Sequence, residues 1–298
     1  MAQKKNGSKI SLIISHCNLP IDWIPGYIGD NYNIQDITIY SKCGMEVEGI
    51  DKLKSVGKPK IIRLVNVGRC DHSYAHWIAE HYQSIVRDKD QDSIAFFLKD
   101  NNYHQSVYRP FDEVFTFASE LGFGCALKPI WCDCPEGHHQ CEPNNGMMLH
   151  NKTEVDSFEM RHRHVRLGRD DGSVDTFVSE EYPTLKTWKD SMGLVTANSQ
   201  TIPVCYGGMF AVKQERVLDQ SEESWKRVKE SLEREDNLVE GHYAERLWAS
   251  ILYGNDKKYA EAVDNFVLPH INQTSRCIGR PGMILVPKGT SAELLNKF

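Results

Sequence analysis

The first hundred residues alternate short apolar runs with one amphipathic segment, and this alternation restricts the chain to few folds. The segment Ser73–Val86 carries aromatic and branched side chains at helical spacing, which predicts a helix. Strands that alternate with helices usually form a parallel sheet with helices on its faces. We therefore expect an α/β fold with a mixed, mostly parallel central sheet flanked by helices. Its first strands are predicted at Ser11–Ser15, Asp36–Ser41, Lys60–Val65 and Ser93–Leu98.

The second half of the chain continues this pattern after an interruption. Pro203–Leu252 contains a Gly-Gly pair, a short apolar strand and two helical patterns, at about Glu222–Arg234 and Glu240–Tyr253. From about 131 to 175, Gly, Pro, Asn, His and charged residues dominate, and we predict an irregular insert there. The chain 1–298 is thus predicted to be one α/β domain with that insert.

The charge balance and the lack of long apolar runs exclude two classes of protein. A formal net charge of −6 argues against a nucleic-acid-binding protein, which usually presents a basic face. No apolar run approaches the ~20 residues that a membrane span needs. We therefore expect no membrane-spanning helix. The apolar run Ile10–Ile14 is too short for the core of a signal peptide. We expect a cytoplasmic protein, or a lumenal one if an anchor has been removed.

The cysteines favour free thiols. Nine is an odd number, and the cysteines are scattered through a long chain, which suits reduced thiols better than a disulfide framework. Cys132, Cys134, His138 and Cys141 form a dense cluster of soft ligands that could hold a structural zinc. Their spacing is not a standard zinc spacing, and a disulfide or free thiols in a loop is the favoured alternative.

Four segments, in order, resemble a family found in fungi, algae and bacteria that is grouped with the glycosyltransferase A fold. The most specific segment is Asn66–Ile85, NVGRCDHSYAHWIAEHYQSI. The other segments are Leu12–Trp23, Ser93–Asn101, and Tyr206–Val212 together with Glu240–Ile251. The resemblance implies that fold and, by kinship, transfer of a sugar from a nucleotide diphosphate sugar.

The chain departs from the family at strand ends. Cys70 stands where the family usually has Glu, Lys99-Asp100 replaces Gln-Gly, and Tyr206–Met209 replaces bulkier residues. These departures weaken any metal-binding role, because metal ligands would sit at these strand ends.

Sugar transfer needs a site for the diphosphate at the carboxyl ends of parallel strands. Asp100 follows a buried strand and is our candidate to hold the diphosphate or its divalent cation, Mn²⁺ or Mg²⁺. The sequence Lys-Asp-Asn provides one acid, so a paired DxD motif is absent. The alternative is an aspartate that caps a turn.

The second helix of Pro203–Leu252 provides the candidate base. Glu245 is predicted to deprotonate an acceptor hydroxyl, with Glu240 in reserve. His242 lies three residues before Glu245 on the same face and is a candidate metal ligand. The alternatives are a structural Glu245 paired with Arg69 or Arg246, and a His242 that only hydrogen-bonds in the core.

Five further residues are predicted to bind the nucleotide sugar. Arg69 offers a bidentate fork for a diphosphate, and Asn66 or His72 offers hydrogen bonds to the nucleotide or the acceptor. Gly207 and Gly208 would let the backbone approach a sugar ring. The alternatives are a polar network that fixes the loop and an ordinary bulge or turn.

These residues predict a glycosyltransferase that moves a sugar from a nucleotide diphosphate sugar to a hydroxyl acceptor on a glycan. Two other classes stay open. One is a carbohydrate-binding protein that keeps the fold without catalysis. The other is a zinc-stapled interaction module centred on Cys132–Cys141.

Overall fold

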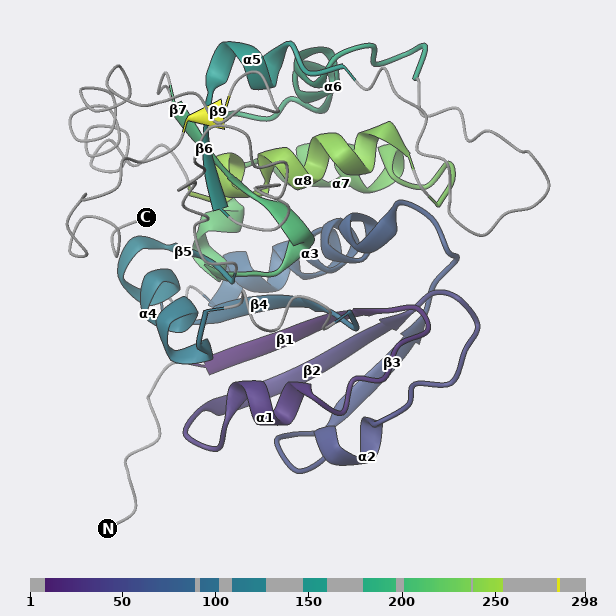
Figure 1. The fold of residues 1–298 in the computed structure, drawn as a ribbon, viewed down its shortest axis with the longest axis vertical. Helices are drawn as coiled ribbons and strands as arrows, with labels where there is room; N and C mark the ends of the chain where they lie inside the picture. The colour runs from purple at the N-terminus through teal and green to yellow at the C-terminus, as the bar shows by residue number, and fades with distance from the viewer. Residues whose placement is uncertain are drawn as a thin grey trace, which may run out of the picture.

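The structure is a computed structural model and describes residues 9–88, 92–101, 109–126, 147–159, 179–196, 201–236, 238–253 and 283–284. Its centre is a six-stranded sheet with the strand order β3-β2-β1-β4-β8-β5 (Figure 1). The first four of these strands run parallel, and β8 runs antiparallel to both β4 and β5. The predicted α/β fold with a mixed, mostly parallel sheet is therefore confirmed. The strands are β1 (Lys9–His16), β2 (Asn33–Ser41), β3 (Pro59–Arg63), β4 (Ile94–Lys99), β5 (Phe123–Cys125) and β8 (Phe210–Lys213).

The central strands are buried on both faces. Every residue of β1 after Lys9 is buried, as are the first five residues of β4. Continuous apolar runs of this kind are typical of parallel strands covered by helices on both sides. The predicted runs therefore correspond to β1, β2, β3 and β4, with boundaries that differ by at most three residues.

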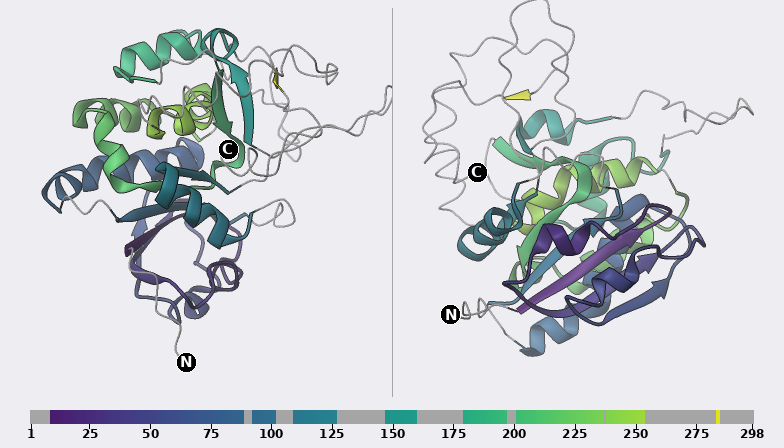
Figure 2. Two further views of the ribbon diagram at one scale, coloured as in Figure 1. Left: turned by 90° about the vertical axis from the view of Figure 1, so that its left-hand side faces the viewer. Right: turned by 60° about the horizontal axis from the view of Figure 1, so that its bottom comes forward.

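Helices lie on both faces of the sheet and continue outward in layers. Figure 1 shows α1 and α2 in front of the parallel strands, while α3 covers the opposite face. Figure 2 shows α7 and α8 beyond α3, and α5 and α6 farther out. The helices are α1 (Ile24–Ile28), α2 (Ile50–Leu53), α3 (Arg69–Asp88), α4 (Phe111–Leu121), α5 (Lys152–Asp156), α6 (Leu185–Met192), α7 (Glu222–Ser231) and α8 (Val239–Leu252).

The helix boundaries follow local chemistry. Ser221 caps α7 by accepting a hydrogen bond from the Ser224 amide. Thr184 and Thr187 form a reciprocal capping box at the start of α6, and Gly193 ends that helix in the left-handed conformation. The two predicted C-terminal helices are confirmed as α7 and α8.

A second sheet has three antiparallel strands in the order β7-β6-β9. These are β6 (Met147–Asn151), β7 (Thr201–Cys205) and β9 (Met283–Ile284), and β7 packs beside α8. Because β6 and α5 fall within 131–175, the predicted insert is not irregular throughout. In the part of the chain that the structure describes, no helix is both long and apolar enough to cross a bilayer.

The core between these layers is rich in tryptophan. Trp77, Trp188, Trp225 and Trp248 are all fully buried. The rings of Trp225 and Trp248 stack with centroids 6.1 Å apart, which joins α7 to α8. Large buried aromatic rings contribute most of the apolar area in such a core, so α8 is held firmly against α3 and the sheet.

Candidate functional site

The candidate site is built where α3 begins, at the carboxyl edge of the parallel strands. The backbone enters this helix through two left-handed residues, Gly68 with φ 58° and Arg69 with φ 54°. A Cβ on Gly68 would lie 2.3 Å from the Leu232 carbonyl oxygen, so only glycine fits there. Among the described residues, Arg69 alone has a positive φ without being glycine. Strain of this kind often marks a functional position.

The chain just before α8 fixes this turn. The Gly68 amide donates to the Glu235 carbonyl at 2.6 Å, and the Arg69 amide donates to the Asp236 carbonyl at 3.0 Å. These bonds satisfy two donors at the turn that enters α3. The turn therefore depends on a segment more than 160 residues away in the sequence.

The Arg69 side chain lies between two side chains of α8. Its Nη1 donates to His242 Nδ1 at 3.0 Å and lies 3.7 Å from Glu245 Oε2. The other Glu245 oxygen accepts the Gly207 amide at 3.0 Å. The structure thus brings together four predicted site residues: Arg69, Gly207, His242 and Glu245. It also shows the alternative for Glu245, a carboxylate paired with Arg69.

The charges in this cluster stabilise one another. Burial acts to raise the pKa of Glu245, but Arg69, Arg246 and the Gly207 amide together hold that pKa below its ordinary value. Burial acts to lower the pKa of Arg69, and the nearby carboxylates more than offset it. Both groups are therefore charged at neutral pH, and Glu245 is a weaker base than a free glutamate.

Asp71 is a site residue that the sequence interpretation missed. It is fully buried, and its Oδ1 accepts the Trp248 indole N–H at 2.7 Å. Burial raises the pKa of Asp71 to about 6, which Arg69 and the Trp248 bond only partly offset. One sequence feature could have indicated Asp71, because it lies in the first turn of the helix that begins at Arg69. Acidic residues are common in first turns, however, since they complement the helix dipole.

The glycine pair forms a tight turn beside α3. Gly207 and Gly208 have φ values of 84° and 67°, which are left-handed. The Gly208 carbonyl accepts the Tyr74 hydroxyl at 2.6 Å, and a Cβ on Gly208 would lie 3.0 Å from Cys70 Sγ. The predicted Gly-Gly turn is therefore present, and it lies against α3.

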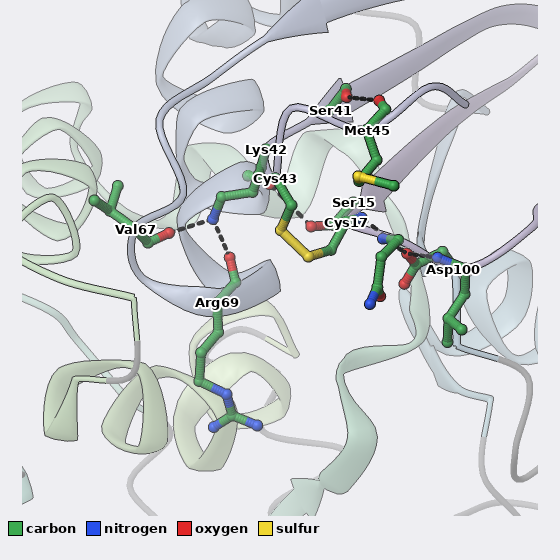
Figure 3. The surroundings of a disulfide bond; sticks show 12 residues. Ser15, Cys17, Ser41, Lys42, Cys43, Met45, Val67, Arg69 and Asp100 are labelled. Carbon is green, nitrogen blue, oxygen red and sulfur yellow. Dashed lines mark hydrogen bonds between the residues drawn. A yellow bond between two sulfur atoms is a disulfide. The ribbon is translucent and has the colours of Figure 1, made fainter. Parts of the chain in front are cut away.

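A disulfide and a buried lysine support the site from the sheet side (Figure 3). Cys17 and Cys43, which follow the adjacent strands β1 and β2, form a disulfide. Lys42, which directly precedes Cys43, is buried. Its ammonium group donates hydrogen bonds to the backbone carbonyls of Val67 and Arg69. Burial lowers the pKa of Lys42 to about 8. The lysine and the disulfide together tie the start of α3 to the ends of β1 and β2.

Asp100 has a structural role at the same edge. Its Oδ2 accepts the backbone amides of Cys17, Asn18 and Leu19 at 2.8, 3.0 and 3.0 Å. The carboxylate therefore closes the turn that follows β1, directly after β4 ends. The role of Asp100 is therefore the turn-capping alternative that its sequence position suggested. The three amide hydrogen bonds occupy one of its carboxylate oxygens completely.

Three other predicted site residues lie apart from the Arg69 cluster. Glu240 is buried and pairs with Arg234, with Oε1 2.6 Å from Nη2, on another side of α8. His72 is buried near Lys42 and His76, and burial lowers its pKa to about 3. Asn66 is exposed in the loop before α3 and makes no side-chain hydrogen bond within the described ranges.

The donor set does not fit a divalent cation. No three His, Cys, Asp or Glu side chains form a metal-binding group in the part of the chain that the structure describes. Asp100 is engaged by three amides, and His242 faces a guanidinium, which would repel a cation. The proposed zinc ligands Cys132, Cys134, His138 and Cys141 lie outside the described residues.

The prediction of reduced thiols is wrong for four cysteines. Cys17 pairs with Cys43 and Cys125 pairs with Cys205, with Cα–Cα distances of 4.8 and 5.7 Å. Both distances lie in the range that a disulfide requires. Pairs separated by 26 and 80 residues meet only through the sheet topology, which the spacing of cysteines does not reveal. Cys70 is a free thiol, and burial raises its pKa to about 12.

Comparison of the chain with known families, with curated proteins and with solved structures finds no match. Of the resemblance described above, the α/β fold with its mixed, mostly parallel sheet is what the structure supports.

Proposed function

We propose that this protein is a glycosyltransferase that moves a sugar from a nucleotide diphosphate sugar to a hydroxyl acceptor on a glycan. The observation that carries the proposal is the Arg69–Glu245 pair, half-buried beside the first turn of α3 at the carboxyl edge of the parallel strands. Ligands of open α/β sheets collect at that edge. The dipole at the start of α3 and the cation of Arg69 both favour an anionic group there.

In this proposal the chain's own cations neutralise the diphosphate. Arg69, the first residue of α3, and Lys99, the last residue of β4, both lie close to Cys70. A guanidinium binds a diphosphate with paired hydrogen bonds, and Arg69 would exchange its contact with Glu245 for the phosphate oxygens. No step in the proposal passes through a metal ion.

Release from Arg69 would also activate Glu245. Without Arg69 the pKa of this carboxylate rises, because one of the charges that lower it is lost while the effect of burial remains. Glu245 would accept the proton of the acceptor hydroxyl, the acceptor oxygen would form a bond to the anomeric carbon, and the bond from that carbon to the diphosphate would break. The nucleotide diphosphate then leaves with the electron pair.

The test combines ligand binding with turnover. Thermal unfolding is followed with UDP, GDP, CMP and their sugars, with and without Mn²⁺, because a ligand that binds the native state raises the melting temperature. Glu245→Gln should retain binding of the stabilising nucleotide and lose about 100-fold or more in turnover. Glu120→Gln, on the exposed face of α4, is the matched control. If no nucleotide raises the melting temperature, the proposal fails.

A carbohydrate-binding protein without catalysis is the second candidate. The observation that favours it is the mutual pairing of Arg69, His242 and Glu245, together with the structural use of Asp100. Such a protein would bind a glycan and would not hydrolyse or transfer from any donor sugar. Glycan-array binding with no donor consumption would select it.

The disulfides bear on the compartment. Disulfides persist in oxidising compartments and are rare in the cytosol. With Cys17–Cys43 and Cys125–Cys205 formed, we propose that the protein works in an oxidising compartment, in place of the cytoplasm expected from its sequence.

A further inference from the structure

A large cavity lies at the other end of the sheet. It has a volume of about 820 Å³ and opens between the amino-terminal halves of β1, β2 and β3 and the last turns of α3. Small-molecule sites usually enclose about 300 to 1,000 Å³. The cavity is therefore large enough for a ligand, and it does not include any residue of the Arg69 cluster.

A polar stripe on the sheet forms the floor of this cavity. Ser11 of β1 is the register partner of Asp36 of β2, and Thr38 of β2 is the partner of Lys60 of β3. Because side chains two residues apart on a strand share a face, Asp36 and Thr38 point to the same side. Sheet faces covered by helices in α/β proteins are normally apolar. Packing against α3 does not account for a polar row at this position.

A chain of hydrogen bonds holds this stripe in place. Gln214 Nε2 donates to Ser11 Oγ at 3.2 Å, and Ser11 Oγ donates to Asp36 Oδ1 at 2.5 Å. Burial raises the pKa of Asp36, and the hydrogen bond from Ser11 partly offsets this effect. Side chains that are already ordered by hydrogen bonds lose less conformational entropy when a ligand binds than mobile side chains do.

The cavity wall also carries hydrogen-bond donors that the protein leaves unused. Trp77 also lines the cavity, but its indole N–H, which has no hydrogen-bond partner within the described residues, is buried in the wall and is not exposed to the cavity. Lys58 and Lys60 line the rim, and neither forms an ion pair in the part of the chain described here.

We propose that this cavity is a second binding site, for a small phosphate-bearing polyol. The lysines at the rim would bind the phosphate, and Asp36 would accept a hydroxyl. The proposal does not depend on the function proposed for the carboxyl edge, because the two sites share no residue.

The test uses ribose 5-phosphate as the probe, with ribose and inorganic phosphate as its two halves. Binding to the full chain is measured by titration calorimetry. Ribose 5-phosphate should bind more tightly than either half. Absence of binding by ribose 5-phosphate, or equal binding of ribose, would overturn the proposal.

Variants then locate the bound probe. The double variant Lys58→Gln/Lys60→Gln should weaken binding about tenfold or more, the loss expected for charge-assisted bonds. Lys54→Gln, an exposed lysine outside the cavity, should leave the affinity unchanged. Equal affinity in the wild type and the double lysine variant would refute the site. Arg69→Ala should not alter this binding, so failure of the carboxyl-edge proposal and failure of this one are distinguishable.

Discussion

The two edges of the six-stranded sheet differ in how their charged groups are used. At the carboxyl edge Arg69 contacts Glu245 and His242, and Asp100 accepts three backbone amides. At the amino edge Lys58 and Lys60 form no ion pair within the described ranges, although they line a cavity. Beside the role proposed for Arg69 and Glu245, the carboxyl edge has Asp100, which stabilises the fold, whereas the unpaired lysines at the amino edge are available to a ligand. Removal of Asp100 should therefore cost stability, and removal of Lys58 and Lys60 should cost affinity.

The largest expected loss follows removal of the Cys17–Cys43 disulfide. Cys17→Ser/Cys43→Ser should reduce the free energy of unfolding by about 3 kcal/mol, because the open chain regains loop entropy. Chemical denaturation of oxidised protein measures this loss. Cys70→Ser, which alters the free thiol, is the control. A double variant as stable as the wild type would show that the carboxyl edge does not need this bond.

Asp100→Ala should have the next largest effect. It leaves the amides of Cys17, Asn18 and Leu19 without their acceptor, at a cost of about 2 to 3 kcal/mol. Asp100→Asn keeps an acceptor oxygen and should lose less. Asp30→Ala, at an exposed position, provides the baseline in the same urea titration. Equal losses for Asp100→Ala and Asp30→Ala would contradict the structural role of this carboxylate.

Gly208→Ala should reduce the free energy of unfolding by about 2 kcal/mol. Alanine is strained at a left-handed φ of 67°, and its Cβ would contact Cys70 Sγ. Adding Cys70→Ala removes the contact and leaves the backbone strain, so the double variant should recover part of the loss. Gly26→Ala is the matched control, because a Cβ there meets nothing within 4 Å. Thermal unfolding of the four proteins measures the effect, and a neutral Gly208→Ala would rule out the strained turn.

Asp71 should make the stability depend on pH. Its pKa rises from 3.8 in the unfolded chain to about 6 in the folded protein. The folded state therefore binds its proton more tightly, and this contribution is present below pH 3.8 and disappears as the pH rises through about 6.

The comparison protein for this pH effect is Asp71→Asn, which keeps an oxygen for the Trp248 indole. Between pH 7 and pH 4, the wild type should gain on the order of 1 kcal/mol relative to the variant. Urea titrations at several pH values measure the difference. A difference that does not change with pH, or that changes in the opposite direction, would contradict the raised pKa.

The smallest expected effect is at the amino edge. Lys58→Gln/Lys60→Gln should change the free energy of unfolding by no more than about 0.5 kcal/mol, as exposed substitutions usually do. The same denaturation experiment measures it. A large loss would show that these lysines support the fold, and the contrast between the two edges would then disappear.

The sequence predicts the parallel half of the sheet well and the second sheet poorly. Buried parallel strands appear as continuous apolar runs, so β1 and β4 were predictable from local sequence. The strand β6 lies among Asn, Gly and His residues and contains no comparable run, and β7 has Pro203 within it. Its pairing with β6 is a long-range contact that residue periodicity does not reveal.

The candidate site was predictable in part for a similar reason. His242 and Glu245 share a helical face, which spacing alone indicates. Their meeting with Arg69 requires α3 and α8 to pack, and the burial of Asp71 follows from the same contact. The polar stripe at the amino edge was not predictable, because the positions of Ser11 and Asp36 beside one another depend on strand register.

The turn that opens α3 also sets an order of assembly. Its amides at Gly68 and Arg69 bind carbonyls at Glu235 and Asp236, which a ribosome adds much later. During synthesis the first strands can collapse, but this turn must wait for the segment before α8. Contacts between distant parts of a chain form slowly because the intervening loop must close first. The carboxyl edge should therefore be among the last parts of the protein to become native.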